Sequence, residues 1–517
     1  MGGDARRGAR VIRIDGDRLT VPDVVAVARR GERVVLRPEA RARVRRCRRA
    51  VEALARGSAL AYGIKTGFGQ LQDVAIPAED QRALQLNLVR SHAAGAGPPM
   101  PGEWVRAALL ARANALAKGH SGVRESVVDA LLRLLNARVH PVVPGRGSLG
   151  ASGDLAPLAH VALVLVGEGR AEHRGRILDG RRALRAAGLR PLVLETKEGL
   201  ALVNGTSFMA GLGALLAADA ARLVKDAQVV ASASFEALRG SPAPFDPRLS
   251  ALRRHPGQAR VAANLLRLLR GSEIVPSHRG PHRVQDAYTL RCLPQVLGAV
   301  ADAIDRLRPC VEIELNSAND NPLILPETGE SLSGGNFHGE ALALELDHLA
   351  IALAVLAGFS ERRTARLVDT HLSGLPPFLT DRSGLNSGLM VAQYTAAALV
   401  SECKLLAHPA SVDSLPTSAN QEDWVSNGWL AAVKAHGALG HATAVTAIEL
   451  LCAAQGLDFV RGLRPGRGPA AARAALRARV PTLREDRELA PDLEAARQLL
   501  ESGEVLEAAE RAAGPLR

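Results

Sequence analysis

The segment GEALALELDHLAIALAVLAGFSERRTARLVD, residues 339–369, restricts the possible folds more than any other part of the sequence. It contains no proline and a single internal glycine, Gly358. A helix of this length spans roughly 45 Å, and apolar residues surround most of its circumference. Because such a helix has to be covered on several sides, the segment predicts a long-helix bundle core that is shared between subunits.

Other segments predict helices as well, because their apolar residues recur at three- and four-residue spacing. Examples are SVVDALLRLLNARV, AARQLLESGEVLEAAERA and GLMVAQYTAAALVSECKLLAHP, the last ended by Pro409. Strand-like alternation is short and local, as in ARVIRIDGDRLT. A chain of 517 residues is long for one compact core. We therefore predict a mainly α fold with an N-terminal helical lobe (1–205), and a second region (206–517) that holds the long-helix bundle and the C-terminal helices.

Composition argues against several classes of partner. The net charge is +12, and its densest part is RARVRRCRRA, residues 41–50, where no aromatic residues are interleaved to stack on bases. This pattern favours a solvated basic helix over a nucleic-acid site. No uninterrupted apolar run reaches the roughly 18 residues of a membrane helix, so no membrane partner is expected. The five cysteines form no CxxC pair, and MGGDARRGAR has no apolar leader region, which together indicate a cytoplasmic protein with reduced thiols.

The stretch GRGSLGASGDLAPLAH, residues 145–160, allows two interpretations. In the first, Gly145, Gly147 and Gly150 have the spacing of a dinucleotide-binding fingerprint. That fingerprint requires a strand to enter the glycine turn, but the entering segment carries Pro141 and Pro144. Since a central strand does not accept proline, we do not expect a dinucleotide site.

The second interpretation concerns the tripeptide Ala151-Ser152-Gly153. Gly153 has no Cβ, so its backbone nitrogen can closely approach the carbonyl of Ala151. If these atoms join and water is lost, including the Ser152 hydroxyl, an exocyclic methylene remains. That group is an electrophile, which no standard side chain provides. The alternative is an ordinary helix-entry turn before Asp154, and the tripeptide alone does not decide between the two.

The surrounding motifs resemble a known family. GSLGASGDLAPLAH resembles the signature of the aromatic amino-acid ammonia-lyases and aminomutases, whose members carry the prosthetic group 4-methylideneimidazole-5-one (MIO). The resemblance continues in order along nearly the whole chain through YGIKTGFG, NLVRSHAAG, EGLALVNGTS, RVQDAYTLRC, NSANDNP, GGNFHGE and HPASVDSLPTSANQEDWVS. It implies the mainly α MIO-lyase fold, MIO formed from Ala151-Ser152-Gly153, an amino-acid substrate, and a homotetramer with active sites shared between subunits.

The resemblance also implies residue roles. Tyr62 would be the base that removes the substrate's β-proton, although a phenol with a pKa of about 10 needs cations or hydrogen bonds that favour its anion. Tyr288 would support MIO and proton transfer. Arg291, three residues later, would bind the substrate carboxylate, and Glu422 would accept a proton or hold the substrate. The implied catalytic residues are Tyr62, Ser152, Tyr288 and Glu422; the implied MIO contacts are Ala151, Ser152, Gly153, Asn204 and Phe337; the implied substrate contacts are Ser91, His92, Asn204, Gln285, Arg291 and Glu422.

The implied substrate follows from Ser91-His92, which resembles the pair of the histidine-specific members of the family. The expected reaction is therefore elimination of ammonia from L-histidine to give trans-urocanate. Lys65, Ser207 and Trp424 depart from the histidine-specific pattern and keep other substrates open. The alternatives are a phenylalanine or tyrosine ammonia-lyase, a 2,3-aminomutase, and a non-catalytic helical scaffold.

Histidine spacing does not favour a metal site. His278 and His282 are four residues apart, but Pro281 interrupts the helix that would align them. His436 and His441 are five apart, which is the wrong spacing for one helical face. We expect no catalytic metal.

Overall fold

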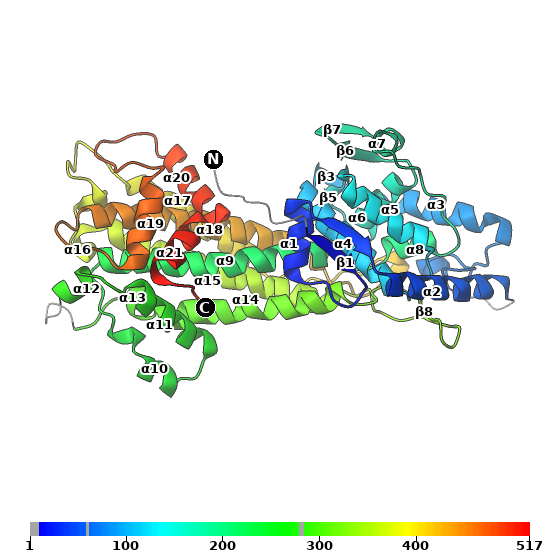
Figure 1. Ribbon diagram of the computed structural model, residues 1–517, viewed down its shortest axis with the longest axis horizontal. Helices are drawn as coiled ribbons and strands as arrows, with labels where there is room; N and C mark the ends of the chain where they lie inside the picture. The colour runs from blue at the N-terminus through cyan, green and yellow to red at the C-terminus, as the bar shows by residue number, and fades with distance from the viewer. Residues whose placement is uncertain (1–9, 58–61, 279–283) are drawn as a thin grey trace. The chain divides into compact units, whose positions relative to one another are not determined.

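A computed structural model describes residues 10–57, 62–278 and 284–517. Within these ranges the chain is mainly α-helical, with a few short strands (Figure 1). The predicted fold class is therefore confirmed. The chain divides into unit 1, made of Met1–Ala218, Leu307–Leu346 and Pro409–Val433, and unit 2, made of Asp219–Arg306, Asp347–His408 and Lys434–Arg517. The predicted lobes at 1–205 and 206–517 stay a prediction.

Four long helices contribute residues to both units, within the described ranges: α9 (Ser207–Ala237), α14 (Leu293–Leu315), α15 (Glu340–Val368) and α18 (Gly428–Asp458). The structure confirms the helix predicted over 339–369, which begins and ends one residue inside those limits as α15. The sequence pattern did not single out α9, α14 or α18. In α9 and α18, alanine and glycine are interspersed with apolar residues on all sides, so neither helix shows a clear apolar stripe.

The sequence contains no uninterrupted apolar run of membrane-helix length, but a criterion of mean hydropathy that allows up to two charged residues is met. The expectation of no membrane partner stays a prediction. By length and composition alone, α9, α15 and α18 meet that criterion among the described residues. Isolated charged residues interrupt each apolar run, but the mean hydropathy of the run stays high enough for a membrane-spanning helix. The most apolar stretch of α9 and of α18 is 78% buried inside the chain, whereas that of α15 is 56% buried. The apolar surface of α15 is therefore the least covered of the three.

Unit 1 combines helices with small sheets. Strand β1 pairs with β2 in parallel, and the pairs β3–β5, β4–β6, β6–β7 and β8–β9 are antiparallel. The remaining elements of unit 1 are β1 (Val11–Ile14), α1 (Val21–Arg30), β2 (Arg33–Leu36), α2 (Pro38–Arg56), η1 (Gly69–Leu71), η2 (Ala78–Asp80), α3 (Gln81–His92), β3 (Ala96–Pro99), α4 (Gly102–Ala117), α5 (Glu125–Asn136), β4 (Val139–Pro141), β5 (Pro144–Arg146), α6 (Leu155–Leu165), β6 (Arg170–His173), β7 (Arg176–Asp179), α7 (Gly180–Ala186), α8 (Glu198–Val203), β8 (Leu323–Leu325), β9 (Glu330–Leu332) and η5 (Ser418–Asn420).

The segment before the glycine turn does form strands, but not the strand that a dinucleotide site needs. Pro141 ends β4 and Pro144 begins β5, and each strand has three residues. Both lie at the edge of a small antiparallel sheet, where a missing backbone N–H is tolerated. The parallel βαβ unit that a dinucleotide fingerprint requires does not occur at this turn.

The basic segment at 41–50 lies on α2, and several of its arginines are paired with carboxylates. Arg41 contacts Asp129 at 2.9 Å and also pairs with Glu125, and Arg48 contacts Glu52 at 2.9 Å. Part of the positive charge on this helix is therefore compensated within unit 1.

Unit 2 is helical apart from its loops, within the described residues. At its core, Arg363 of α15 and Glu449 of α18 form a fully buried ion pair at 2.6 Å. Ser234 and Ser360 donate hydrogen bonds to the same carboxylate. The remaining elements of unit 2 are η3 (Ala243–Phe245), α10 (Pro247–Leu252), α11 (Pro256–Leu268), α12 (Ile274–Ser277), α13 (Tyr288–Arg291), α16 (Thr370–Ser373), η4 (Pro377–Leu379), α17 (Met390–Leu406), α19 (Arg467–Arg477), α20 (Ala490–Ser502) and α21 (Glu504–Ala513).

Candidate active site

The tripeptide Ala151-Ser152-Gly153 lies in a tight turn that is bound to a second backbone segment. The N–H of Gly153 donates to the carbonyl of Gly150 at 3.2 Å. The N–H of Gly205 donates to the carbonyl of Ser152 at 3.0 Å, and the N–H of Asp154 donates to the carbonyl of Gly205 at 2.7 Å. A Cβ on Gly153 would lie 2.3 Å from the Gly205 oxygen. Only glycine therefore fits at position 153.

The backbone of this turn has an unusual conformation. Ser152 has a φ of +49°, in the left-handed region that residues other than glycine seldom adopt. Gly150 and Gly153 also have positive φ, at +87° and +78°. Ala151 and Ser152 are half-buried, so a group formed from them would be reachable by a small substrate.

Asp154 attaches this turn to the start of a long helix. Its buried carboxylate accepts hydrogen bonds from the N–H groups of Phe208 and Met209, at 2.8 and 3.0 Å, in the first turn of α9. Burial raises the pKa of Asp154 to about 7, against the lowering effect of these hydrogen bonds. Sequence reasoning treated Asp154 only as a helix-entry residue, since its partners lie more than 50 residues away.

Asn204 lies directly before Gly205 and is buried. Its Nδ2 donates to Oδ1 of Asp320 at 2.9 Å and to the backbone carbonyl of Asn321 at 3.2 Å. The other oxygen of Asp320 accepts from Nζ of Lys197 at 2.7 Å. Sequence reasoning missed Lys197 and Asp320. Lys197 lies in TKEGLALVN, the stretch that ends at Asn204, and Asp320 lies in NSANDNP, one of the motifs that carry the family resemblance.

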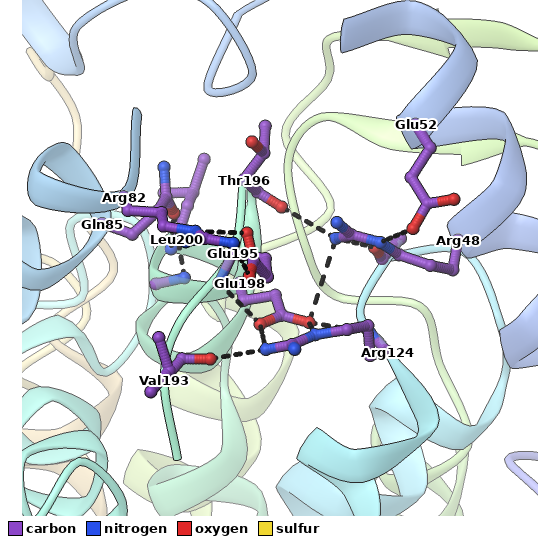
Figure 2. A network of polar contacts seen from close by, with 12 residues as sticks. Arg48, Glu52, Arg82, Gln85, Arg124, Val193, Glu195, Thr196, Glu198 and Leu200 are labelled. Atoms are coloured by element: carbon purple, nitrogen blue, oxygen red, sulfur yellow. Dashed lines mark hydrogen bonds and ion pairs between the residues drawn. The ribbon is translucent and has the colours of Figure 1, made fainter. Parts of the chain in front are cut away.

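A polar network holds helix α8, which leads to Asn204 (Figure 2). The fully buried carboxylate of Glu198 accepts from the backbone N–H, Nε and Nη2 of Arg124, at 2.9, 2.8 and 2.6 Å. Oε1 of Gln85 accepts from the N–H groups of Gly199 and Leu200 at 2.9 and 3.3 Å. Because Gln85 belongs to α3, this contact links the helix that ends at Ser91-His92 to the helix that ends before Asn204.

The charge of Glu422 acts on both Tyr62 and His92. Burial raises the pKa of Tyr62, a hydrogen bond from the Gly69 N–H to its hydroxyl at 3.3 Å lowers it, and the nearby carboxylates of Glu422 and Asp320 raise it further. Burial lowers the pKa of His92, and Glu422 acts in the opposite direction. Unit 1 therefore brings together the predicted base, the predicted specificity residue and the predicted glutamate.

Glu422 is held by a short hairpin. Its backbone N–H and carbonyl pair with those of Thr417 at 3.2 and 2.8 Å, and Thr417 Oγ1 donates to its carboxylate at 3.0 Å. Gly69 ends the segment YGIKTGFG (62–69), which begins with Tyr62. It packs against the hairpin so closely that a Cβ on Gly69 would lie 2.7 Å from Oγ of Ser418. The segment that carries Tyr62 and the hairpin that carries Glu422 are therefore in direct contact.

Ser91 and His92 form a hydrogen-bonded pair at the end of α3. Oγ of Ser91 donates to the carbonyl of Leu88 at 3.1 Å and lies 3.0 Å from Nδ1 of His92. In the tautomer in which the hydroxyl hydrogen is donated to Leu88, Nδ1 of His92 carries the proton and Nε2 is a hydrogen-bond acceptor.

Phe337 is the remaining predicted site residue of unit 1. Phe337 is half-buried in the segment that precedes α15. Its neighbour His338 contacts the backbone carbonyl of Trp424 through Nε2 at 3.3 Å. The Trp424 side chain is 60% exposed.

The remaining predicted residues, Gln285, Tyr288 and Arg291, belong to unit 2. Tyr288 is 68% exposed, and the guanidinium of Arg291 lies 4.5 Å from the centre of its ring. The two side chains thus share a face of α13, as their spacing predicts. Gln285 and Arg291 line a pocket of about 790 Å³. Nε of Arg291 is buried and has no hydrogen-bond partner among the described residues.

Among residues 10–57, 62–278 and 284–517, no group of three or more histidine, cysteine, aspartate or glutamate side chains is placed to hold a metal ion. His282 lies outside the described residues. His278 uses both ring nitrogens on backbone carbonyls, at 2.7 and 3.1 Å. The expectation that no catalytic metal is needed stays a prediction.

Comparisons with known proteins cover nearly the whole chain. The sequence model of the family described as "Aromatic amino acid lyase" matches residues 19–478. The protein named histidine ammonia-lyase from Symbiobacterium thermophilum is 54% identical over 97% of this chain and 99% of its own length. The protein of the same name from Caldanaerobacter subterraneus is 52% identical over 96% and 97%.

Solved structures of ammonia-lyases and aminomutases are similar to this chain. The tyrosine aminomutase from Streptomyces globisporus matches with a TM-score of 0.94 and 39% identity, over 98% of this chain and 100% of that chain. The histidine ammonia-lyase from Trypanosoma cruzi matches with a TM-score of 0.91 and 40% identity, over 98% and 96%. The range 19–478 matched by the family includes every predicted site residue.

Proposed function

Because the chain belongs to the aromatic amino acid lyase family, we propose that it is a carbon–nitrogen lyase that eliminates ammonia from L-histidine and releases trans-urocanate. The observation that carries this proposal is the Ser91-His92 pair, which lies within the electrostatic influence of Glu422, as Tyr62 does. In the tautomer protonated at Nδ1, His92 presents Nε2 as an acceptor. An acceptor of this kind suits the N–H of a substrate imidazole. A phenyl ring would leave it unpaired.

The proposed prosthetic group is MIO, formed from Ala151-Ser152-Gly153 by ring closure and loss of water. The strained turn at Ser152 and the close approach of Gly153 to Gly205 support this assignment. When formed, the group supplies an electrophile that turns the substrate amine into a better leaving group. Asn204 and Phe337 are the residues that would lie beside it.

Tyr62 is the proposed base for the β-proton. Burial and two nearby carboxylates raise the pKa of its phenol, so the neutral form is favoured in the protein by itself. The ammonium group of the substrate brings a positive charge into the same region, and a nearby cation favours the phenolate. Substrate binding is therefore expected to activate this base.

The other residues bind and orient the substrate. His92 stays neutral to lower pH than an ordinary histidine because burial lowers its pKa, and neutral His92 accepts the imidazole N–H through Nε2. Glu422 accepts a proton or holds the substrate. Gln285, Tyr288 and Arg291 complete the proposed set, with the planar guanidinium of Arg291 suited to the substrate carboxylate.

The proposed assembly is a homotetramer in the cytoplasm, with active sites shared between subunits. The exposed apolar residues Leu344, Ile351 and Val355 on α15 support association, since a long helix rarely leaves such a surface to water. Light scattering of the purified protein measures the mass of the assembly. A stable and fully active monomer would contradict both the tetramer and the shared sites.

The function is tested by offering L-histidine, L-phenylalanine and L-tyrosine to the purified enzyme and recording urocanate, cinnamate and coumarate by their absorbance. We expect urocanate to form fastest. Cinnamate without urocanate would indicate a phenylalanine-specific lyase, a β-amino acid would indicate an aminomutase, and no reaction would indicate a scaffold.

The substitution His92→Leu tests the residue that carries the proposal. A site that hydrogen-bonds its substrate discriminates against an analogue without that group by up to about 10⁴-fold. His92→Leu should therefore lose activity on histidine far more than on phenylalanine. Equal losses on both substrates would contradict the assignment of His92 to the imidazole.

A further inference from the structure

The side-chain amide of Asn204 is hydrogen-bonded to the carboxylate of Asp320, which accepts hydrogen bonds and does not donate them. Both hydrogens of its Nδ2 are used on one side, by the Asp320 carboxylate at 2.9 Å and the Asn321 carbonyl at 3.2 Å. An ionised carboxylate cannot donate, so the amide has to present its nitrogen to Asp320. The carbonyl oxygen of Asn204 is therefore on the opposite edge of the amide. No described residue donates a hydrogen bond to that oxygen.

Asp320 lies between two buried cations. Nζ of Lys197 lies 2.7 Å from its Oδ2, and the two side chains are 0% and 1% exposed. The fully buried guanidinium of Arg112 is a second cation that interacts with Asp320. A carboxylate between these charges accepts hydrogen bonds only, so the orientation of the Asn204 amide follows from the charge on Asp320.

The backbone around Lys197 is held in one place. Lys197 has a φ of +71° directly before α8, and its neighbour Glu198 accepts a hydrogen bond from Arg124 in the network of Figure 2. The chain from Lys197 through Asp320 to Asn204 thus ends at Gly205, which is hydrogen-bonded to the tripeptide turn.

We propose that Asp320, paired with Lys197, is a positioning residue that orients the Asn204 amide so that its carbonyl oxygen accepts a hydrogen bond from the amino group of the substrate. This inference rests on the proposed function. A reversed amide would direct N–H groups at the substrate's ammonium group, and two donors repel each other. The buried pair therefore acts on the reaction through Asn204, without touching the substrate.

The competing explanation is that Lys197 and Asp320 only stabilise the fold. The chain offers a matched control in the pair Arg363–Glu449, which is also fully buried and contacts none of the predicted site residues. Replacing both members of a buried ion pair by neutral residues is often tolerated, whereas removing one member leaves an unpaired charge. Neutral double variants of the two pairs can therefore be compared directly.

The first test compares the double variants Lys197→Met/Asp320→Asn and Arg363→Met/Glu449→Gln. The introduced amide at position 320 can offer either edge, so Asn204 is no longer held in one orientation. We expect kcat per modified subunit to fall by about tenfold or more for the first pair, because small errors in positioning cost roughly 10- to 100-fold. The second pair should lower the unfolding temperature and leave kcat unchanged.

Mass spectrometry of the 151–153 segment gives a readout independent of turnover. The Lys197→Met/Asp320→Asn variant should still show the mass loss of about two waters. A wild-type kcat in this variant would overturn the proposal. Loss of the modification would also overturn it, because Asp320 would then act in the formation of the group and not in orienting Asn204.

The second test is a double-mutant cycle between Asn204→Ala and Asp320→Asn. If Asp320 acts through Asn204, adding Asp320→Asn to Asn204→Ala should cause no further loss of kcat. The proposal would be overturned if the kcat loss of the double variant equals the product of the losses of the two single variants. If Asp320→Asn alone does not fold, the Lys197→Met/Asp320→Asn variant takes its place in the cycle.

The cycle is run with whichever amino acid the wild-type enzyme converts. If that amino acid is not histidine, the proposed function fails, but the cycle still decides whether Asp320 acts through Asn204. The two failures are therefore distinguishable.

Discussion

The two sets of predicted site residues differ in how the chain holds them. The first set surrounds the tripeptide turn in unit 1, where Gly153 and Asn204 are buried. Asn204 and the neighbours of Gly153, Ser152 and Asp154, are hydrogen-bonded to distant segments. The second is the segment Val284–Arg291 in unit 2, where Val284 is 99% exposed and Tyr288 68% exposed. The tripeptide turn is thus enclosed by the chain's own packing, whereas the Val284 and Tyr288 side chains of the second segment are left exposed.

This difference has an energetic side. Around the turn, a Cβ at Gly153 has no room, so changes of shape there affect folding and chemistry together. In the Val284–Arg291 segment, the contact between Arg291 and the Tyr288 ring is worth about 0.5–1 kcal/mol at an exposed position. Substitutions in this segment should therefore change turnover and leave stability almost unchanged.

The largest expected effect is that of Ser152→Ala, which separates chemistry from shape within the turn. The Ser152 side chain is half-buried and small, so folding and assembly should be unaffected. Turnover should be abolished, because alanine cannot lose the hydroxyl that leaves the methylene. The wild-type protein should show a mass about two waters below that of its encoded chain, and the variant should not. An unmodified mass for active wild-type protein would refute the tripeptide assignment.

Asp154 provides the next largest effect, this time on stability. Its pKa is about 7 in the folded protein, raised mainly by burial, against an ordinary value of 3.8. Between these values the folded protein holds a proton that the unfolded chain has lost. The contribution of Asp154 to stability is therefore greatest below pH 4 and decreases as the pH rises to about 7. Each unit of difference corresponds to about 1.4 kcal/mol, so the total is at most about 4 kcal/mol.

Asp154→Asn isolates this effect. An amide oxygen can still accept from the N–H groups of Phe208 and Met209, which both bond to one carboxylate oxygen. Unfolding measured in urea from pH 5 to pH 8 should show the wild type losing stability relative to the variant as the pH rises. Parallel curves for the two proteins would mean that Asp154 is already ionised at pH 5.

The same contrast explains what could be predicted from the sequence. Ser152, Tyr62 and His92 lie in contiguous motifs, so local pattern and family resemblance identified them. Lys197 and Asp320 are 123 residues apart, and only the fold brings their charges together. A buried lysine is also rare enough that the sequence alone gave no reason to place Lys197 in the interior.

Helices followed a similar rule. The long apolar run of α15 was predicted to within one residue at each end. The stretch AARQLLESGEVLEAAERA has one continuous helical pattern, but the structure divides it into α20 and α21 at Gly503, which has a φ of +82°. Glycine adopts this conformation without steric cost. The spacing of apolar residues continues through Gly503 and therefore does not predict the break between the two helices.

The smallest of the three effects should come from Arg291→Met in the exposed segment. Methionine keeps much of the side-chain volume and removes the charge. A hydrogen bond to a charged group is worth about 1.5–3 kcal/mol, so kcat/KM for histidine should fall by roughly 10- to 150-fold. The loss should appear mainly in KM if Arg291 binds the carboxylate equally well in the ground state and the transition state.

The unfolding temperature makes this prediction a test of the comparison itself. Arg291→Met should leave it unchanged, because no described residue accepts a hydrogen bond from the buried Nε of Arg291. Arg464→Met is a suitable control, since Arg464 is a largely exposed arginine of unit 2 that pairs with Glu273. It should alter neither kcat/KM nor modification of the tripeptide. If Arg291→Met instead unfolds the protein, the segment is held by packing, like the turn, and the distinction between the two sets fails. If kcat/KM is unchanged in a folded variant, Arg291 does not bind the substrate carboxylate, and another cation has to do so.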